Sequence, residues 1–185
     1  MKKYISVLIM IISIQLTMAQ IAIGKTTISS PSVSLEFDYT PNDPTKQRGL
    51  ILPWTNASNT LVSVVPGTII FDSSDHKVKY YKGTDDPNSV ANWVDLTINN
   101  DGKADKSLQE NLPELTDAKV SIGEKTNTNG ILVLEDTDKA MILPTVDKYS
   151  SVINPTAGMM VYDTTNNMIC FFNGTVWTFW KTSNI

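Results

Sequence analysis

A thiol nucleophile with an imidazole base could arise in only one way, because the chain holds one cysteine, Cys170, and one histidine, His76. Such a pair activates the thiol only when the two side chains lie within hydrogen-bonding reach. His76 falls in a turn-like stretch and Cys170 in the middle of a β-type run. We therefore expect a turn histidine and a buried structural cysteine. Zinc and other transition metals need clusters of these residue types, so the sequence predicts no cofactor.

Aspartates supply the remaining metal candidates. The stretch 101–105 is similar to part of a calcium loop, but Leu108 occupies the twelfth position, where a carboxylate is needed. Asp85 and Asp86, close to Asn88, could hold calcium loosely, and a solvated turn is the alternative. We expect no metal centre and keep Asp85 and Asp86 as weak candidates.

Paired carboxylates in a pocket are the other route to acid–base chemistry. Glu36 and Glu135 each follow a leucine, and they recur together with the sequence around them. Recurrence of this kind is typical of a scaffold, so we predict that the protein is not an enzyme. A hydrolase that uses these two carboxylates is the enzymatic alternative.

The four tryptophans fall into two classes. Trp93 and Trp177 recur with the repeat described below, which indicates core positions. Trp54 and Trp180 have no counterpart, and an unpaired aromatic side chain could form a platform for a sugar ring or a peptide. The alternative is local packing or a contact between subunits.

The N-terminal residues predict export. Lys2 and Lys3 precede an almost wholly apolar stretch, 4–16, and Thr17 and Ala19 offer small side chains for cleavage before Gln20. This is the layout of a secretory signal peptide, and an uncleaved N-terminal anchor is the alternative. We expect a protein of the cell surface, the periplasm or the medium, with no stable membrane span after cleavage.

Charge limits the classes of possible partner, and cysteine content limits how the fold can be stabilised. The formal net charge is −4, and no basic run occurs that could grip a phosphate backbone, so nucleic acid is not an expected partner. A single cysteine excludes an intramolecular disulfide. Stability must therefore come from packing or from association.

Two blocks of the sequence repeat each other. A shift of 99 residues superposes the early motifs, and a shift of 91 superposes the later ones after a loop that is eight residues longer in the first block. The matched pairs are 21–24 with 120–123, 35–36 with 134–135, 50–53 with 141–144, 67–72 with 158–163 and 80–84 with 171–175. We divide the chain into a signal peptide (1–19), repeat 1 (20–97), a linker (98–119) and repeat 2 (120–185).

Each repeat predicts a three-stranded antiparallel meander, from β-type runs at 68–72, 77–81 and 91–96 and at 158–163, 168–172 and 176–180. Asn173-Gly174 favours a type I′ turn. The segments before Pro53 and Pro144 indicate short buried strands, and 104–111 in the linker could form two helical turns. The predicted fold class is mainly β, with two diverged copies of a short meander unit.

Consecutive aromatic residues occur at matching places in the two repeats, and side chains of a strand alternate between its faces. Both faces of these strands should therefore be apolar, which suits a sandwich or a contact between subunits. The residues concerned, candidates for partner binding beside Trp54 and Trp180, are Tyr80, Tyr81, Phe171 and Phe172.

The second repeat resembles a unit found in exported proteins of Bacteroidota and in phage tail-fibre-like proteins. The shared motifs are Ile122-Gly123, Leu134-Glu135, Leu143-Pro144, Asn154-Pro155, Gly158, Tyr162-Asp163-Thr164, Phe172-Asn173-Gly174 and Trp177. The resemblance implies a β-rich, often trimeric surface or fibre module that mediates adhesion or assembly. Trp54 and Thr145 replace the basic residue that often follows Leu-Pro in this unit.

Two functions follow as hypotheses. The first is a non-catalytic structural or adhesive module of a cell surface or fibre, which acts through protein association and self-association, with a homotrimer as the expected assembly. The second is a monomeric exported module that binds a glycan or a protein through Trp54 and Trp180.

Overall fold

The computed structural model describes residues 20–83, 92–99, 101–107, 119–123, 128 and 130–181. These residues form a mainly β structure, as predicted, and contain no α-helix. Short 3-10 turns accompany the strands, among them η1 (Pro44–Lys46), η2 (Ser58–Thr60) and η4 (Tyr149–Ser151). The predicted signal peptide, 1–19, lies outside the described residues.

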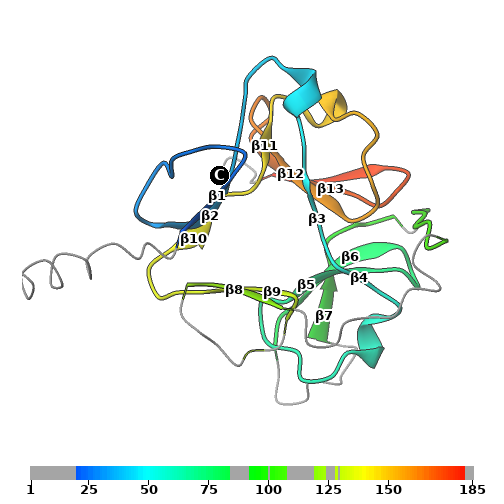
Figure 1. Cartoon of the computed structure of the whole chain (residues 1–185). Helices are drawn as coiled ribbons and strands as arrows, with labels where there is room; N and C mark the ends of the chain where they lie inside the picture. Colours follow the sequence, from blue (N-terminus) through cyan, green and yellow to red (C-terminus); the bar gives the residue numbers. More distant parts are fainter. Residues whose placement is uncertain are drawn as a thin grey trace, which may run out of the picture.

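Each repeat forms the predicted antiparallel meander (Figure 1). Repeat 1 supplies β5 (Ile69–Asp72), β6 (Lys77–Tyr81) and β7 (Trp93–Asp95), and repeat 2 supplies β12 (Met159–Asp163), β13 (Met168–Phe172) and β14 (Trp177–Trp180). A short strand adds to each meander in parallel, β4 (Trp54–Thr55) to β5 and β11 (Thr145–Val146) to β12. Trp54 pairs with Phe71 and Thr145 with Tyr162, so the register obeys the shift of 91.

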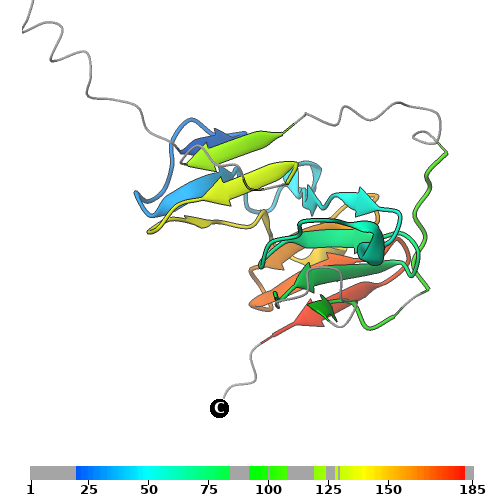
Figure 2. The same ribbon diagram turned by 90° about the horizontal axis from the view of Figure 1, so that it is seen from below.

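The opening segment of each repeat forms a parallel pair that sequence reasoning did not predict. In repeat 1, β1 (Ile21–Ile23) pairs with β2 (Val33–Phe37), and in repeat 2, β8 (Val120–Gly123) pairs with β9 (Leu132–Glu135). These strands and β10 (Ala140–Met141) gather on one side of the molecule, and the two meanders lie on the other (Figures 1 and 2).

Backbone conformation confirms the repeat residue by residue. Except for Asn42, which lies in the longer loop of repeat 1, the described residues with positive φ occur in pairs at the two shifts. This conformation is costly enough for most residues that it marks a defined local structure. The pairs are Gly24 with Gly123, Ser63 with Asn154, Gly67 with Gly158, His76 with Asn167, and Gly83 with Gly174.

Two local predictions were wrong. The turn at Asn173 is not type I′, because Gly174 has a positive φ and Asn173 does not. Instead, the Asn173 side chain accepts hydrogen bonds from the amides of Thr175 and Val176, which closes a longer loop. In the linker, 104–107 is not helical, and the rest of the expected helix lies outside the described residues.

Two hydrophobic clusters fill the interior. The first combines both repeats, with Phe71 and Val78 from repeat 1 and Met160 and Phe171 from repeat 2 packed around Leu52. The second belongs to repeat 2 alone and contains Val146, Val152, Met159, Val161, Cys170 and Phe172. The two repeats therefore share a core, and neither meander closes its inner face without the other.

Candidate association surface

The segments around the Leu-Pro motifs, 49–55 and 140–146, join the two repeats by exchanging strands. In repeat 1, β3 (Leu50–Ile51) leaves its own sheet and pairs antiparallel with β12 of repeat 2, with Ile51 opposite Met159. The Leu52 amide extends this pairing by donating to the Gly158 carbonyl at 3.0 Å. In repeat 2, β10 pairs in parallel with β2 of repeat 1.

A loop of repeat 1 strengthens this contact. The longer loop seen in the sequence, which includes η1, encloses Asp147 of repeat 2. The Tyr39 hydroxyl and the Asn42 amide each donate to the Asp147 carboxylate at 2.6 Å, and Gln47 accepts from the Asp147 amide at 2.7 Å. The hydrogen bond to Asp147 raises the pKa of Tyr39. The extra residues thus serve the contact between repeats.

Both unpaired tryptophans bridge the repeats. Trp54 of repeat 1 donates from Nε1 to the Ala157 carbonyl of repeat 2 at 2.9 Å, and Trp180 of repeat 2 donates to the Leu96 carbonyl of repeat 1 at 2.6 Å. Trp54 is half-buried and packs on Phe71, whereas Trp180 is 47% exposed. The structure therefore gives each a packing role, and binding of a ligand stays a prediction.

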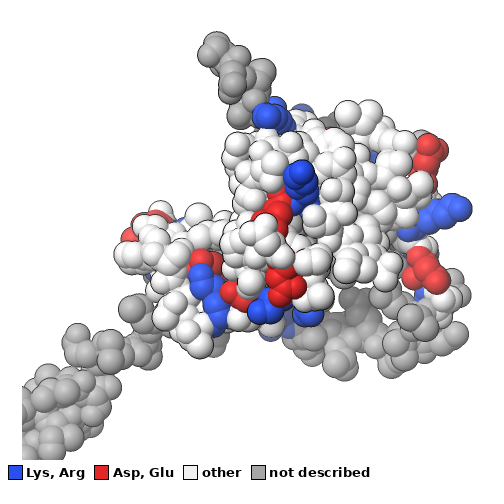
Figure 3. All heavy atoms as spheres, turned by 90° about the horizontal axis from the view of Figure 1, so that it is seen from above, with Lys and Arg blue, Asp and Glu red and all other residues white. Residues whose placement is uncertain are grey.

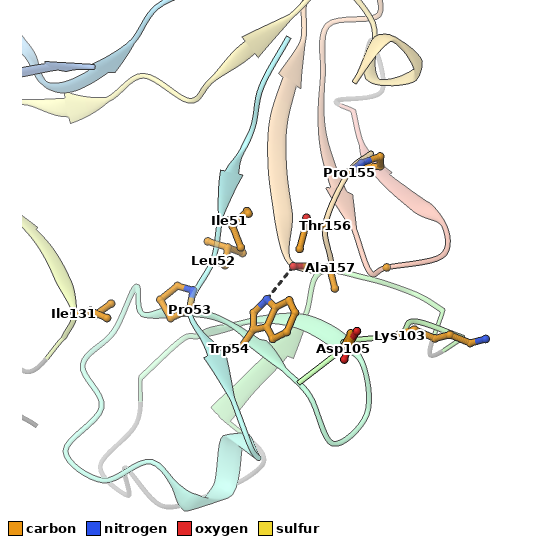
Figure 4. A pocket seen from close by; sticks show the side chains of 11 residues that line it. Ile51, Leu52, Pro53, Trp54, Lys103, Asp105, Ile131, Pro155, Thr156 and Ala157 are labelled. Carbon is orange, nitrogen blue, oxygen red and sulfur yellow. Dashed lines mark hydrogen bonds between the residues drawn. The ribbon is translucent and has the colours of Figure 1, made fainter. Parts of the chain in front are cut away.

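A depression of about 680 Å³ opens beside Trp54. Ile51 and Ile131, both exposed, stand at its wall with Pro155 and Thr156, and the Trp54 ring lies against Ala157 (Figure 4). Lys103 and Asp105 of the linker supply the charges. This depression is apolar and open, and Trp180 does not line it.

The predicted aromatic contact residues are mostly internal. Phe171 and Phe172 are buried and belong to different clusters, as the alternation along β13 requires. Tyr81 is buried against Trp93 at a ring separation of 5.3 Å, and its counterpart Phe172 meets Trp177 at 5.1 Å. Tyr80 is half-buried. Whether these four residues contact a partner stays a prediction.

A buried aspartate recurs at the end of the first meander strand. Asp72 accepts from the Ser58 amide at 2.8 Å, and Asp163 accepts from the Tyr149 amide at 3.1 Å, so each carboxylate caps the 3-10 turn of its repeat. Burial would raise the pKa of Asp72, but hydrogen bonds from Ser74 and Lys79 hold it well below its ordinary value.

The residue facing this aspartate differs between the repeats. Lys79 of repeat 1 is buried and bonded to Asp72 at 3.0 Å and to Asp75 at 2.6 Å, and these bonds raise its pKa although burial lowers it. At the matching place in repeat 2 stands Cys170, fully buried, and burial raises the pKa of its thiol to about 12. A thiol with this pKa is not a nucleophile at neutral pH.

The other candidates for chemistry are dispersed. His76 lies in the turn before β6, and Cys170 in β13. Glu36 is buried and bound to Lys25, whereas Glu135 is exposed. Asp85 and Asp86 lie outside the described residues, and within the described ranges no three His, Cys, Asp or Glu side chains gather where they could hold a metal.

The surface shows small mixed groups of charge. On the face seen in Figure 3, lysine and aspartate or glutamate side chains stand close together, separated by wide uncharged areas. No helix in the described part of the chain is long and apolar enough to cross a membrane.

In the described part of the chain, two strands have an open edge at the place where their counterparts in the other repeat are paired. β9 pairs with β8 alone, and the beginning of β5 pairs with β6 alone. Their counterparts β2 and β12 both carry an additional strand from the other repeat. Exposed backbone groups at such an edge favour the addition of another strand.

Comparison with known proteins agrees with an association role. A family model described as a phage tail like trimerisation region matches residues 121–185, about a third of the chain. No curated protein and no solved structure matches the chain. The match covers repeat 2 almost entirely, so this repeat is similar to a trimerisation module. It supports tail-fibre-like repeats, self-association and a structural, non-enzymatic role.

Proposed function

We propose that this protein is an exported structural module that assembles into a homotrimer and serves as an adhesive or connecting part of a cell surface or fibre. It would be exported through cleavage after Ala19, in the manner of the Bacteroidota surface proteins that it resembles. The observation that carries the proposal is the match of 121–185 to a trimerisation region.

The strand edges support association in particular. Apolar side chains on β8 and β9 and beside them are exposed, Val120 at 53%, Ile131 at 61% and Leu132 at 38%. A monomer would leave this apolar surface and the adjoining backbone groups in water, where an unpaired edge invites aggregation. Pairing within a defined oligomer removes this hazard.

The test is the absolute mass of the mature protein, recovered from expressing cells and measured by light scattering after size exclusion. We expect a mass of three chains and, by mass spectrometry, an N-terminus at Gln20. A monomer at all concentrations would contradict the assembly, and a chain that keeps residues 1–19 would contradict cleavage.

A second candidate function rests on the depression beside Trp54. An open apolar depression with one aromatic wall could hold a sugar ring or a peptide of another protein, as a monomeric binding module would require. The test is a glycan and protein binding screen with the wild type, Trp54→Ala and Trp180→Ala. Binding that survives both substitutions would eliminate this function.

A further inference from the structure

The two repeats contact each other through different surfaces. Repeat 1 offers the backbone of Leu50–Ile51 to β12 of repeat 2, and repeat 2 offers Ala140–Met141 to β2 of repeat 1. Each repeat thus uses one edge of its own Leu-Pro segment, and the two repeats use opposite edges. A contact of this kind is heterologous, so the same contact can continue to a further unit.

The shift of 91 residues between the repeats predicts the first strand pairing between two chains. Met159 corresponds to Thr68 and Ile51 to Ile142, so the pair Ile51–Met159 becomes Ile142–Thr68. In the same way, the bond from the Leu52 amide to the Gly158 carbonyl becomes one from Leu143 to Gly67.

The second pairing follows from the parallel contact of β10 with β2. Ala140 pairs with Val33, and the corresponding residues are Gly49 and Leu132. The edge of β3 that faces away from β12 would therefore meet the open edge of β9.

Burial differs between the paired edges and the open edges in the described part of the chain. Met159 and Met160 of the occupied β12 edge are 8% and 3% exposed, whereas Ile69 of β5 and the preceding Thr68 are half-buried. On the other edge, Val33 is 5% exposed and its counterpart Leu132 is 38% exposed. The residues at the proposed points of pairing, Thr68, Ile69 and Leu132, are uncharged, which is compatible with the addition of a strand.

We propose that repeat 2 of one chain pairs with repeat 1 of the next through these two contacts, Met141–Leu143 of the first chain along Gly67–Ile69 of the second, and β3 of the second along β9 of the first. The occupant of each open edge is a second copy of this chain. The corresponding edge in the other repeat already pairs with a strand of this same sequence, β3 on β12 and β10 on β2. This inference rests on the proposed self-association and names its surface.

The first experiment coexpresses two chains, one with Thr68→Cys and one with Ile142→Cys. The Ile142→Cys chain carries a tag that makes it larger, and the assembled protein is oxidised mildly. Directly opposed residues of antiparallel strands lie within reach of a disulfide. We expect a mixed disulfide between the two chains. The control pair, Thr68→Cys with Leu143→Cys, is slipped by one residue, which turns the side chain to the other face, and it should cross-link at least tenfold less.

The second variant, Leu132→Lys, places a charge at the β9 edge, where lysine blocks strand addition. We expect dissociation to monomers that keep the circular dichroism spectrum of the wild type, with an unfolding temperature lowered only by the lost association. The control Val62→Lys alters a side chain that is 74% exposed in the loop before β5, and it should retain assembly. If the wild type has the mass of an oligomer, two results would overturn this inference without affecting the proposed function. They are equal cross-linking of the two cysteine pairs and full assembly of Leu132→Lys. A monomeric wild type would overturn it together with the proposed function.

Discussion

The two repeats use the same segment in opposite ways. In repeat 1 the Leu-Pro segment reaches forward to β12, and in repeat 2 it reaches back to β2, so each repeat keeps one edge occupied and one edge open. The longer loop around Asp147 reinforces the contact inside the chain, and the shorter loop of repeat 2 has no room for its equivalent. In the proposed assembly, the contact within the chain would therefore be stronger than its copy between chains.

The interiors of the repeats differ as well. Repeat 1 buries an ion pair, Lys79 with Asp72, where repeat 2 buries the thiol of Cys170 beside Asp163. A buried ion pair contributes little net stability because the loss of hydration offsets the attraction, but removal of one partner is costly. The folding of repeat 1 should therefore depend more on charge than that of repeat 2.

The largest effect is expected at the contact between repeats. Leu52 is 5% exposed in the shared cluster, and Leu52→Ala should lower the free energy of unfolding by about 3 kcal/mol. Leu143, its counterpart, is half-buried in the single chain, so Leu143→Ala should cost less in unfolding and more in assembly. Chemical denaturation measures the loss of folding stability in both variants, and light scattering measures the loss of assembly. Equal losses of stability and of assembly in the two variants would contradict the different roles of Leu52 and Leu143.

The ion pair of repeat 1 comes next. Asp72→Asn should cost about 2 kcal/mol, because Lys79 loses one of its two charged acceptors and keeps Asp75 and the Ser58 hydroxyl. As a control, Asp95→Asn removes the exposed partner of Lys77 and should cost less than about 0.5 kcal/mol. Urea unfolding measures both, and an Asp72→Asn variant as stable as the control would show that the pair is dispensable.

Acid should weaken the fold through the same carboxylate. The folded pKa of Asp72 lies below its ordinary 3.8, so its contribution is fully present above that pH and declines as pH falls toward the folded pKa. We expect the free energy of unfolding to fall below about pH 4, and Asp72→Asn to flatten that decline. The pKa of Asp163 is lowered too, so a slope remains in the variant. An unchanged slope would contradict the assignment.

The smallest effects concern the tryptophans that bridge the repeats. Trp54→Phe removes the hydrogen bond to Ala157 and should cost about 1 kcal/mol. Trp180→Phe should cost less, because Trp180 is 47% exposed and water replaces part of the bond to Leu96. Thermal unfolding followed by tryptophan fluorescence ranks the two, and the reverse order would show that Trp180 is the stronger bridge.

The meanders could be predicted from the sequence, because β-type runs separated by turn residues specify local antiparallel pairing. The exchange of β3 could not, since a strand of two residues carries no information about a partner far away in sequence. The parallel pairs β1–β2 and β8–β9 could not either, because strands close in sequence are ordinarily expected to pair antiparallel. Asn173 was misjudged because its side chain satisfies nearby amides in a longer loop. Trp54 and Trp180 were recognised as exceptions to the repeat, but only the structure shows that each bonds to the other repeat.

The most direct test of the account is hydrogen exchange at two corresponding amides in the assembled protein. The amide of Met160 faces β3 in the single chain, and Ile69 occupies the matching place on β5. Pairing between chains would protect both amides to a similar degree. If Met160 is protected in the oligomer while Ile69 exchanges as an exposed amide does, the β5 edge is open in the assembly and the repeated contact is contradicted.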